Sequence, residues 1–228
     1  MKKNLQTAFQ TRQYMLSKDF EIYYYNDHGL SKVDLHTHNY YEFYFFLEGS
    51  VSIQIEDKTF SLRFGDVILL PPEISHRPII HDQTIPYRRF VLWISKEYCS
   101  GLISLSSDYG NLLQYVQINK TYIFHNNEIT FNTIQSMILR LLEELHSDRF
   151  GRSAQIPLCI NGLLLHLNRT IHERNYPERK NTETSLYQHI ANYIENHIEE
   201  ELSLDVLSQT FFVSKYHIAH IFKENFGI

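Results

Sequence analysis

The sequence predicts an α+β chain, with a β-barrel first, an antiparallel helix pair next and an all-α segment last. Three observations lead to this fold class. Residues 20–95 consist of short runs of Tyr, Phe, Ile and Val broken by Gly, Pro and Asp. Two apolar helical faces follow between residues 129 and 172, and residues 202–228 contain two short amphipathic helices around a tight corner. Strand-type runs followed by helix-type runs are typical of α+β folds or of separate domains.

The barrel follows a mostly polar N-terminal arm, residues 1–19. From Phe20 onward the chain reads as a series of strands: EIYYY, YEFYFFLEG, SVSIQIE, KTFSL, DVILLPP and RRFVLWI. Several short strands with closely spaced turn signals predict a small all-β barrel or sandwich. We interpret Gly49 and Gly65 as turn positions that need positive φ, and Pro71-Pro72 as a strand end.

A group of possible metal ligands lies within this barrel: His36, His38, Glu42 and His76. The first three share parity along an extended segment, so a continuous strand would point them to one face. Tyr44 and Phe46 would follow on that face as candidate effector-pocket residues or as barrel filling. Three imidazoles and a carboxylate suit a divalent ion such as Zn, Ni, Mn or Fe, with open positions for water or substrate. The alternative is that the histidines are simply packed or hydrogen-bonded.

The spacing of these residues resembles the cupin pattern. The first cupin motif, HxHxxxE followed by Gly, is matched by His36, His38, Glu42 and Gly49, and the second, GxxxxxPxGxxH, by Gly65, Pro71 and His76. The chain departs from the pattern at Glu73, where cupins have Gly, and at Ile80, where they have Asn. These departures weaken the interpretation as an enzyme. The resemblance implies a cupin-type barrel with its lead-out over residues 20–127.

A helix pair is predicted over residues 128–174, after a mixed segment, 96–127, without a clear element. The two apolar faces comprise Ile134, Ile138, Leu141, Leu142 and Leu145 within Ile129–His146, and Ile160, Leu163, Leu164 and Leu167 within Ile156–His172. Gly151 supports a helix end between them, and Pro157 suits the first turn of the second helix. Such a pair can pack on the barrel or form a dimer surface. Residues 175–184, NYPERKNTET, are polar and aperiodic, so we place the linker and the domain boundary there.

The C-terminal segment, residues 185–228, contains a helix-turn-helix pattern. Ser203 caps a first helix whose apolar face is Leu204, Leu207 and Phe211, and Ser214 caps a second helix whose Ile218, Ile221 and Phe222 face inward. In DNA-binding proteins of this pattern the second helix enters the major groove. An ordinary helical hairpin is the alternative.

The run SKYHIAHIFKENFG resembles the first helix-turn-helix of the AraC/XylS family of bacterial transcription regulators. The matching positions are Ser214, Ile218, Phe222, Lys223 and Gly227, and residues 186–197 are similar to the lead-in helix of that family. The resemblance implies a cupin sensing domain, a homodimer formed through the helix pair, and double-stranded DNA as a partner. Members of the family continue past Gly227 into a second helix-turn-helix, so we expect residues 185–228 to be a partial DNA-binding domain that binds DNA weakly by itself.

On the outer face of the second helix we expect Tyr216, Ala219 and His220 to contact bases, and Lys215 and Lys223 to contact phosphates. Charge supports weak binding, because residues 183–228 contain seven acidic residues and two lysines. Few cations are therefore available to neutralise phosphates.

Composition places the chain among globular proteins. It has 228 residues, 43% of them hydrophobic, and a formal net charge of −5. Cys99 and Cys159 lack metal-type spacing, and no signal peptide or membrane-length apolar run is present, so we expect a reduced, cytoplasmic protein without membrane contact.

Three functions fit these observations. The favoured one is a non-enzymatic transcription regulator whose cupin domain senses a small molecule, such as a sugar, and controls promoter binding. The second is a metal-dependent cupin enzyme, a dioxygenase or isomerase, with the metal on the four candidate ligands of the barrel. The third is a helical interaction module with a degenerate barrel. A linker, a lead-in helix and a helix-turn-helix favour the first, since a cupin enzyme has no need of them.

Overall fold

The structure is a computed structural model. It describes Thr7 and residues 12–30, 32–175, 186–187, 190–191, 193–194, 198, 202–211 and 213–226. The chain divides into two compact units, Met1–His172 and Glu173–Ile228. Each unit is described by itself below.

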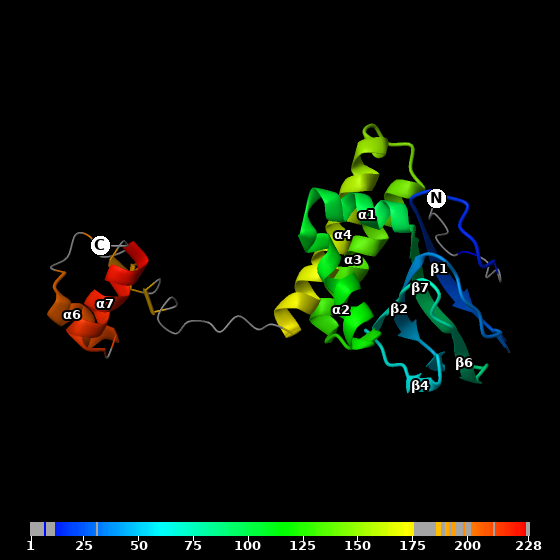
Figure 1. The fold of residues 1–228 in the computed structure, drawn as a ribbon, viewed down its shortest axis with the longest axis horizontal. Helices are drawn as coiled ribbons and strands as arrows, with labels where there is room; N and C mark the ends of the chain where they lie inside the picture. The colour runs from blue at the N-terminus through cyan, green and yellow to red at the C-terminus, as the bar shows by residue number, and fades with distance from the viewer. Residues whose placement is uncertain are drawn as a thin grey trace. The chain divides into compact units, whose positions relative to one another are not determined.

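The first unit contains two antiparallel sheets. The five-stranded sheet has the order β1-β7-β2-β5-β8 and the three-stranded sheet the order β4-β3-β6. The strands are β1 (Phe20–Asp27), β2 (Tyr41–Glu48), β3 (Ser50–Ile55), β4 (Lys58–Ser61), β5 (Val67–Leu70), β6 (His76–Asp82), β7 (Tyr87–Ile94) and β8 (Ile123–Phe124). This is the predicted cupin-type β-barrel, and with the helices that follow it confirms the α+β class (Figure 1).

The central strand β2 shows little alternation of polar and apolar residues, because both of its faces are buried. Residues 42–47 are all buried. Glu42 pairs with Trp93 and Tyr44 with Val91 on one face, and these four side chains line the barrel cavity. Side chains of opposite parity, such as Phe43 and Phe45, join the core cluster that also contains helical residues. A strand buried on both faces reads as a continuous apolar run.

Two turn predictions are confirmed. Gly49, between β2 and β3, has φ of +138°, and Gly65, before β5, has φ of +88°. A Cβ on Gly65 would lie 3.0 Å from the carbonyl oxygen of Asn126, so both backbone and space favour Gly there. Pro71 directly follows the last residue of β5, as expected of a strand end. Glu73, at the position where the cupin pattern has Gly, has φ of +67°. This left-handed backbone conformation, which favours Gly, is therefore present here in a residue with a side chain.

Helices lie beside the strands in Figure 1: α1 (Lys96–Leu105), α2 (Asn111–Asn119), α3 (Glu128–Leu145) and α4 (Arg152–Asn175). We did not predict α1, α2 or β8 in the segment 96–127. The local signals were nevertheless present. The Ser95 hydroxyl caps α1 by accepting a bond of 3.1 Å from the Tyr98 amide, and Leu112 and Val116 bury one face of α2.

The helix pair differs in detail from its prediction. α3 ends at Leu145, so Gly151 does not end it; instead Gly151, with φ of +77°, directly precedes α4. Because α4 begins at Arg152, Pro157 lies inside that helix rather than in its first turn. The predicted apolar faces pack into the chain's own core. Leu141 is 0% and Leu164 6% exposed, so neither can belong to a surface that binds a second copy.

In the second unit, α6 (Leu204–Phe211) and α7 (Lys215–Phe226) form the expected pair. Both predicted caps are confirmed, since Ser203 Oγ accepts from the Val206 amide at 3.3 Å and Ser214 Oγ from the His217 amide at 3.1 Å. The core of this unit contains Ile190, Leu207 and Ile218. Of the predicted lead-in helix, the described residues Leu186, Tyr187, Ile190, Ala191, Tyr193 and Ile194 are helical. Asn175 ends α4, and the rest of the predicted linker, 176–184, lies outside the described residues, as does Gly227.

Within the part of the chain that the structure describes, the helices are too short or too polar to span a membrane.

Candidate metal and ligand site

Three short segments position the candidate ligands. His36 forms an isolated bridge with His76, the first residue of β6, through backbone bonds of 3.1 and 3.0 Å. His38 lies in the loop before β2, where its carbonyl accepts a bond of 2.8 Å from the Glu73 amide. Glu42 is the second residue of β2. His36, His38 and Glu42 therefore do not share one continuous strand, and the prediction from their parity was wrong. The strand β2 begins only at Tyr41, so His36 and His38 precede it.

The structure brings His36, Glu42 and His76 together, with one potential ligand atom from each within 4.8 Å of the others. His38 is not a member of this group, although its Nε2 is 3.0 Å from Glu42 Oε2. Its ring stacks on Tyr40, with centroids 4.0 Å apart. The predicted set of four is thus a group of three with His38 beside the shared carboxylate.

All three imidazoles are oriented by a backbone carbonyl. The Nδ1 atoms of His36, His38 and His76 lie 2.8, 2.9 and 2.9 Å from the carbonyl oxygens of Asp34, Tyr40 and Ile74. A carbonyl can only accept, so each Nδ1 carries the hydrogen and donates it. Each Nε2 then has a lone pair when the ring is neutral. Metal-bound histidines show this arrangement, in which the second nitrogen donates to a carbonyl or carboxylate.

The Glu42 carboxylate is 3% exposed and is the negative centre of the group. Its Oε1 accepts a bond of 2.5 Å from Trp93 Nε1, and its Oε2 lies 3.0 Å from the Nε2 atoms of both His38 and His76. Burial alone would raise the pKa of Glu42, but the His38 and His76 imidazoles outweigh it and hold that pKa well below its usual range. Glu42 is therefore a buried carboxylate that needs a positive partner.

His76 Nε2 is the atom that most directly indicates a ligand. It is close to Glu42 Oε2, yet the direction of approach is not that of a hydrogen bond, and the nitrogen is buried with no hydrogen-bond partner among the residues the structure describes. Burial lowers the pKa of His76, and the Glu42 carboxylate reverses this and raises it. For His36, burial and the nearby His76 charge lower the pKa. Oriented lone pairs around one carboxylate fit a divalent cation.

A cavity of about 310 Å³ opens beside this group. Its lining combines rings, aliphatic groups and charges: Arg12, Gln13, Tyr25, Lys32, Val33, Asp34, His36, Tyr40, Glu42, Tyr44, Pro78, Arg89, Val91 and Trp93. Tyr44 lines the cavity as predicted. Phe46 does not; it packs with Val51 and Tyr87 in a separate cluster, at the end of β2 where the β2–β7 register shifts.

Two arginines that line this cavity, Arg12 and Arg89, were not predicted from the sequence. Arg89 is 2% exposed, donates to Asp27 Oδ2 at 2.7 Å, and lies between the rings of Tyr25 and Tyr87 at 4.7 and 3.9 Å from their centroids. Its alternation with Val91 and Trp93 in RRFVLWI was the signal that could have placed it inside. Arg12 belongs to the N-terminal arm, and no sequence pattern connected it to the barrel.

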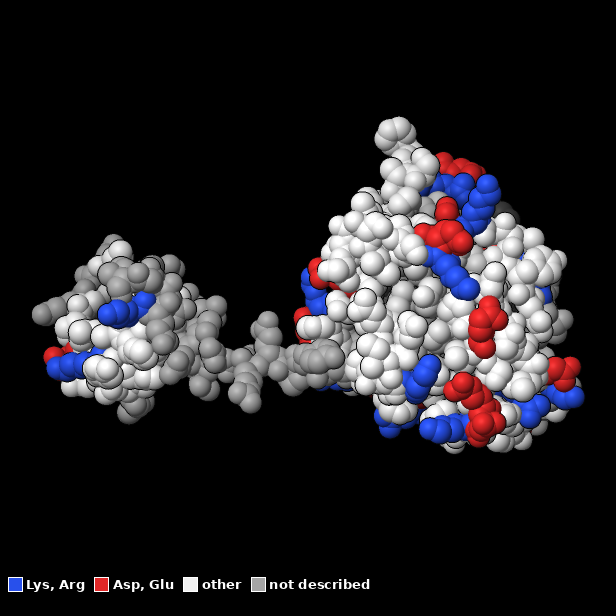
Figure 2. All heavy atoms as spheres, viewed as in Figure 1, with Lys and Arg blue, Asp and Glu red and all other residues white. Residues whose placement is uncertain are grey.

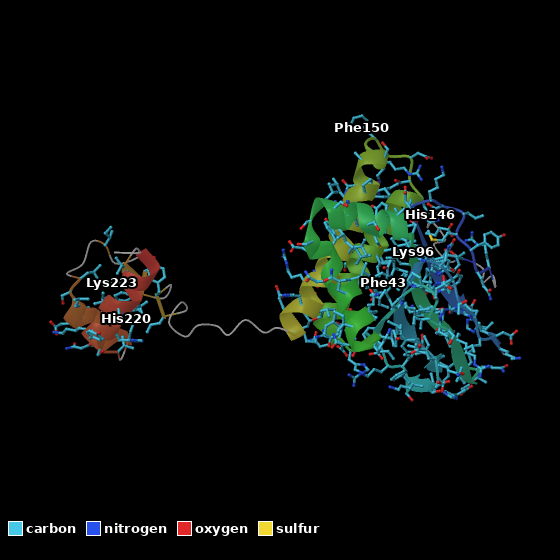
Figure 3. The ribbon with its side chains drawn as sticks, viewed as in Figure 1. Phe43, Lys96, His146, Phe150, His220 and Lys223 are labelled. Carbon is cyan, nitrogen blue, oxygen red and sulfur yellow. The ribbon has the colours of Figure 1, made fainter. Side chains whose placement is uncertain are left out.

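The predicted DNA-reading residues lie on the exposed side of α7: Lys215, Tyr216, Ala219, His220 and Lys223. Figure 3 labels His220 and Lys223 on this helix. The Tyr216 and His220 rings are parallel within 7°, with centroids 6.3 Å apart. Lys215 Nζ forms an ion pair with Asp205 of α6, so this lysine already has an anionic partner within the unit.

Comparison with known proteins gives consistent results. The AraC-like ligand binding domain family matches residues 18–156. The uncharacterized HTH-type transcriptional regulator YbfI of Bacillus subtilis (strain 168) is 22% identical over 221 residues, which cover 96% of this chain and 76% of that protein.

Two solved structures are similar to part of this chain. The plu4264 protein from Photorhabdus luminescens is 27% identical, and the match covers 40% of this chain and 75% of that protein, with a TM-score of 0.33. An RmlC-like cupin family protein with a double-stranded β-helix fold from Methanocaldococcus jannaschii is 13% identical. The match covers 42% of this chain and 93% of that protein, with a TM-score of 0.33.

The matched residues 18–156 include the strands β1 to β8 and the helices α1 to α3, and they make up more than half of the chain. The resemblance to AraC-like regulators with an N-terminal cupin domain is confirmed, and the chain belongs to the AraC-like ligand binding domain family.

Proposed function

We propose that this protein is a transcription regulator in which a small molecule bound inside the barrel controls promoter binding by α6 and α7. The observation that carries the proposal is the cavity of about 310 Å³ next to a buried Glu42, in the part of the chain matched by a ligand-binding family. Pockets of this size class, with a few converging polar groups, typically hold small ligands. The similarity to an HTH-type regulator along 96% of the chain supports the regulatory role.

In this proposal α7 is the reading helix. Tyr216, Ala219 and His220 contact base edges, and Lys223 contacts a phosphate. Lys215 has to leave Asp205 before it can contact a phosphate, so its contribution to affinity is small. On the face of the first unit seen in Figure 2, the described Lys and Arg side chains are interspersed with Asp and Glu, which is unlike the extended basic surface of a DNA-binding domain.

A selection experiment tests DNA binding directly. The full chain is incubated with a randomised duplex library, bound sequences are enriched, and affinity for the winning duplex is measured by fluorescence anisotropy at one fixed salt concentration. We expect the double variant Tyr216→Ala, His220→Ala to lose preference for that duplex. Gln209→Ala, an exposed position on α6, is the matched control. Enrichment of no sequence by the wild-type chain would contradict the proposal.

We further propose that the barrel holds a divalent ion, Zn, Ni, Mn or Fe, on His36, Glu42 and His76. The proposal is supported by the buried His76 Nε2, which has no hydrogen-bond partner among the described residues, and by the three Nδ1–H groups directed at carbonyls. When bound, such an ion supplies a Lewis acid with positions open to oxygen atoms of a ligand. Elemental analysis of protein purified without chelator tests the site, with His81→Ala, a histidine of β6 outside the cavity, as the control for His76→Ala.

The same three residues favour a second candidate function, a metal-dependent cupin enzyme such as a dioxygenase or isomerase. The two functions differ in what α6 and α7 do. An enzyme would turn over its substrate equally well after the Tyr216→Ala, His220→Ala change, and it would select no DNA sequence.

We also propose a homodimer, because a helix-turn-helix reader of paired half-sites needs a two-fold scaffold. The buried stripes of α3 and α4 are excluded as the contact. Their exposed apolar side chains are the better candidates, Leu139 at 36% and Leu158 at 67% exposure. Sedimentation of the wild type and of Leu158→Lys tests this, and a monomeric wild type would contradict it.

A further inference from the structure

Arg12 connects the N-terminal arm to the candidate metal site through one indole ring. Its guanidinium carbon lies 5.3 Å from the centroid of the Trp93 ring, and Trp93 Nε1 donates to Glu42 Oε1 at 2.5 Å. Arg12, Trp93, Glu42 and His36 all line the same cavity. A molecule in this cavity can therefore contact the guanidinium and the metal-ligand group at the same time.

Among the described residues, only one of the two terminal nitrogens of the Arg12 guanidinium has hydrogen-bond partners. Its Nη2 donates to Glu21 Oε2 at 2.5 Å and to the Tyr23 hydroxyl. Its Nη1 is buried and has no hydrogen-bond partner among the residues that the structure describes. A buried, unpaired donor of a charged group is costly, and a carboxylate is the partner that a guanidinium binds best. No described residue accepts the N–H bonds of Nη1, and an anionic oxygen of a bound ligand fits them.

The charges around the cavity also favour an anion once a divalent ion is bound. The lining cations are Arg12, Lys32 and Arg89, and the lining carboxylates are Asp34 and Glu42. Arg12 and Arg89 have further carboxylate partners behind the lining, in Glu21 and Asp27. Four carboxylates and three cations leave one negative charge, which a divalent ion converts into one positive charge. A ligand with a single carboxylate restores neutrality, whereas an uncharged sugar does not.

We propose that the effector is a small carboxylate that carries a hydroxyl or carbonyl oxygen next to its carboxyl group, such as a 2-hydroxy acid, a 2-oxo acid or a sugar acid. Arg12 Nη1 binds the carboxylate, and the neighbouring oxygen faces the ion held by His36, Glu42 and His76. This inference rests on the proposals that the barrel binds an effector and a metal ion, and it adds the chemical class of the effector.

Glycolate is the smallest molecule with both anchors, and glycolamide is its uncharged equivalent. The full chain is loaded with Co²⁺, free metal is removed by dialysis, and each probe is titrated at constant ionic strength. The Co²⁺ absorption spectrum reports the metal, and the thermal midpoint reports binding. We expect glycolate to bind about ten-fold or more tightly than glycolamide, as a charge-assisted hydrogen bond predicts.

Variants of two arginines separate a specific contact from general charge. Arg12→Gln should reduce the preference for glycolate to near unity while Co²⁺ uptake persists. Arg88→Gln, which removes an arginine that pairs with Glu48 outside the cavity, should leave the preference unchanged. Arg12→Lys keeps the charge without the planar fork and should retain part of the preference, which covers the case in which Arg12→Gln fails to fold.

The outcomes separate this inference from the regulatory function. Equal binding of the two probes, no binding of glycolate, or an unchanged preference in the folded Arg12 variants would each overturn it. Failure to take up Co²⁺ would also overturn it, because one of the two anchors would be missing. None of these results bears on whether α7 selects a DNA sequence, which the duplex selection decides independently.

Discussion

The barrel and the C-terminal helix pair place their candidate functional side chains in opposite environments. In the barrel, His38, Glu42 and His76 are between 0% and 5% exposed and contact one another. On α7, Tyr216 is 82% exposed, and the other predicted DNA-reading residues of this helix are exposed as well. Substitutions at the candidate site of the first unit should therefore change both ligand binding and the free energy of unfolding. On α7 they should change binding alone. Substitutions of similar size should have very different consequences in the two places.

The largest effect is expected in the core between the barrel and its helices. Leu141→Glu places a charge at a site with 0% exposure, so we expect a loss of about 4 kcal/mol or more, enough to unfold the first unit. A dimer surface, the alternative for this helix pair, would instead predict a folded monomer, but Leu141 is buried within the core of its own chain. Ile129→Glu, in the first turn of α3 at 81% exposure, is the control and should change the free energy of unfolding by less than about 1 kcal/mol. Urea denaturation followed by circular dichroism measures both.

A second, smaller effect is expected at the buried carboxylate. Glu42→Ala removes the acceptor of Trp93 Nε1 and the negative partner of two imidazoles, which should destabilise the unit by about 3 kcal/mol. Zn²⁺ should raise the thermal midpoint of the wild type, because a ligand of the folded state stabilises it. It should leave that of Glu42→Ala unchanged. A variant that retains the full Zn²⁺ response would show that Glu42 does not hold the ion.

On α7 we expect the reverse pattern. Tyr216→Ala and His220→Ala should each change the free energy of unfolding by no more than about 0.5 kcal/mol, because both side chains are exposed. Affinity for a selected duplex should fall by about ten-fold for each lost base contact. Comparing thermal midpoints with anisotropy curves on the same preparations tests the separation. A large loss of stability in either variant would remove the contrast between the two units.

The smallest effect concerns the loop that holds His38. Glu73 has φ of +67°, which Gly adopts without a steric penalty, and its amide donates to the His38 carbonyl. Glu73→Gly should therefore stabilise the first unit by about 0.5 to 1 kcal/mol. Glu73→Ala, which keeps the Cβ, should show no such gain. Chemical denaturation with well-matched baselines is the measurement.

Local signals predicted the second unit well, and long-range contacts limited the prediction of the first. The caps Ser203 and Ser214 act within three residues, so the sequence contained all the information needed. The short apolar and aromatic runs between turn residues likewise predicted the barrel. The convergence of His36 with His76, by contrast, depends on a bridge between distant segments, and parity along one strand could not represent it.

Arg12 was missed for the same reason, since only folding brings the arm to Trp93. Phe46 was assigned to the pocket by parity, but its side chain packs with Val51 and Tyr87 in a separate cluster. In both cases the error concerns how segments meet, which depends on the whole fold. The identity of the segments themselves was predicted from local pattern.

The carbonyl contacts of the three histidines have a consequence for how such a barrel can diversify. Each ring is oriented by a carbonyl two residues away, so the direction of its Nε2 atom is a property of a segment of three residues. Substitutions elsewhere on the cavity wall can therefore change which molecules fit without turning the imidazoles. If the proposed ion site is occupied, a lineage of such proteins can change the ligand that the cavity accepts while the geometry of that site stays in place, because the two properties are encoded in different parts of the chain.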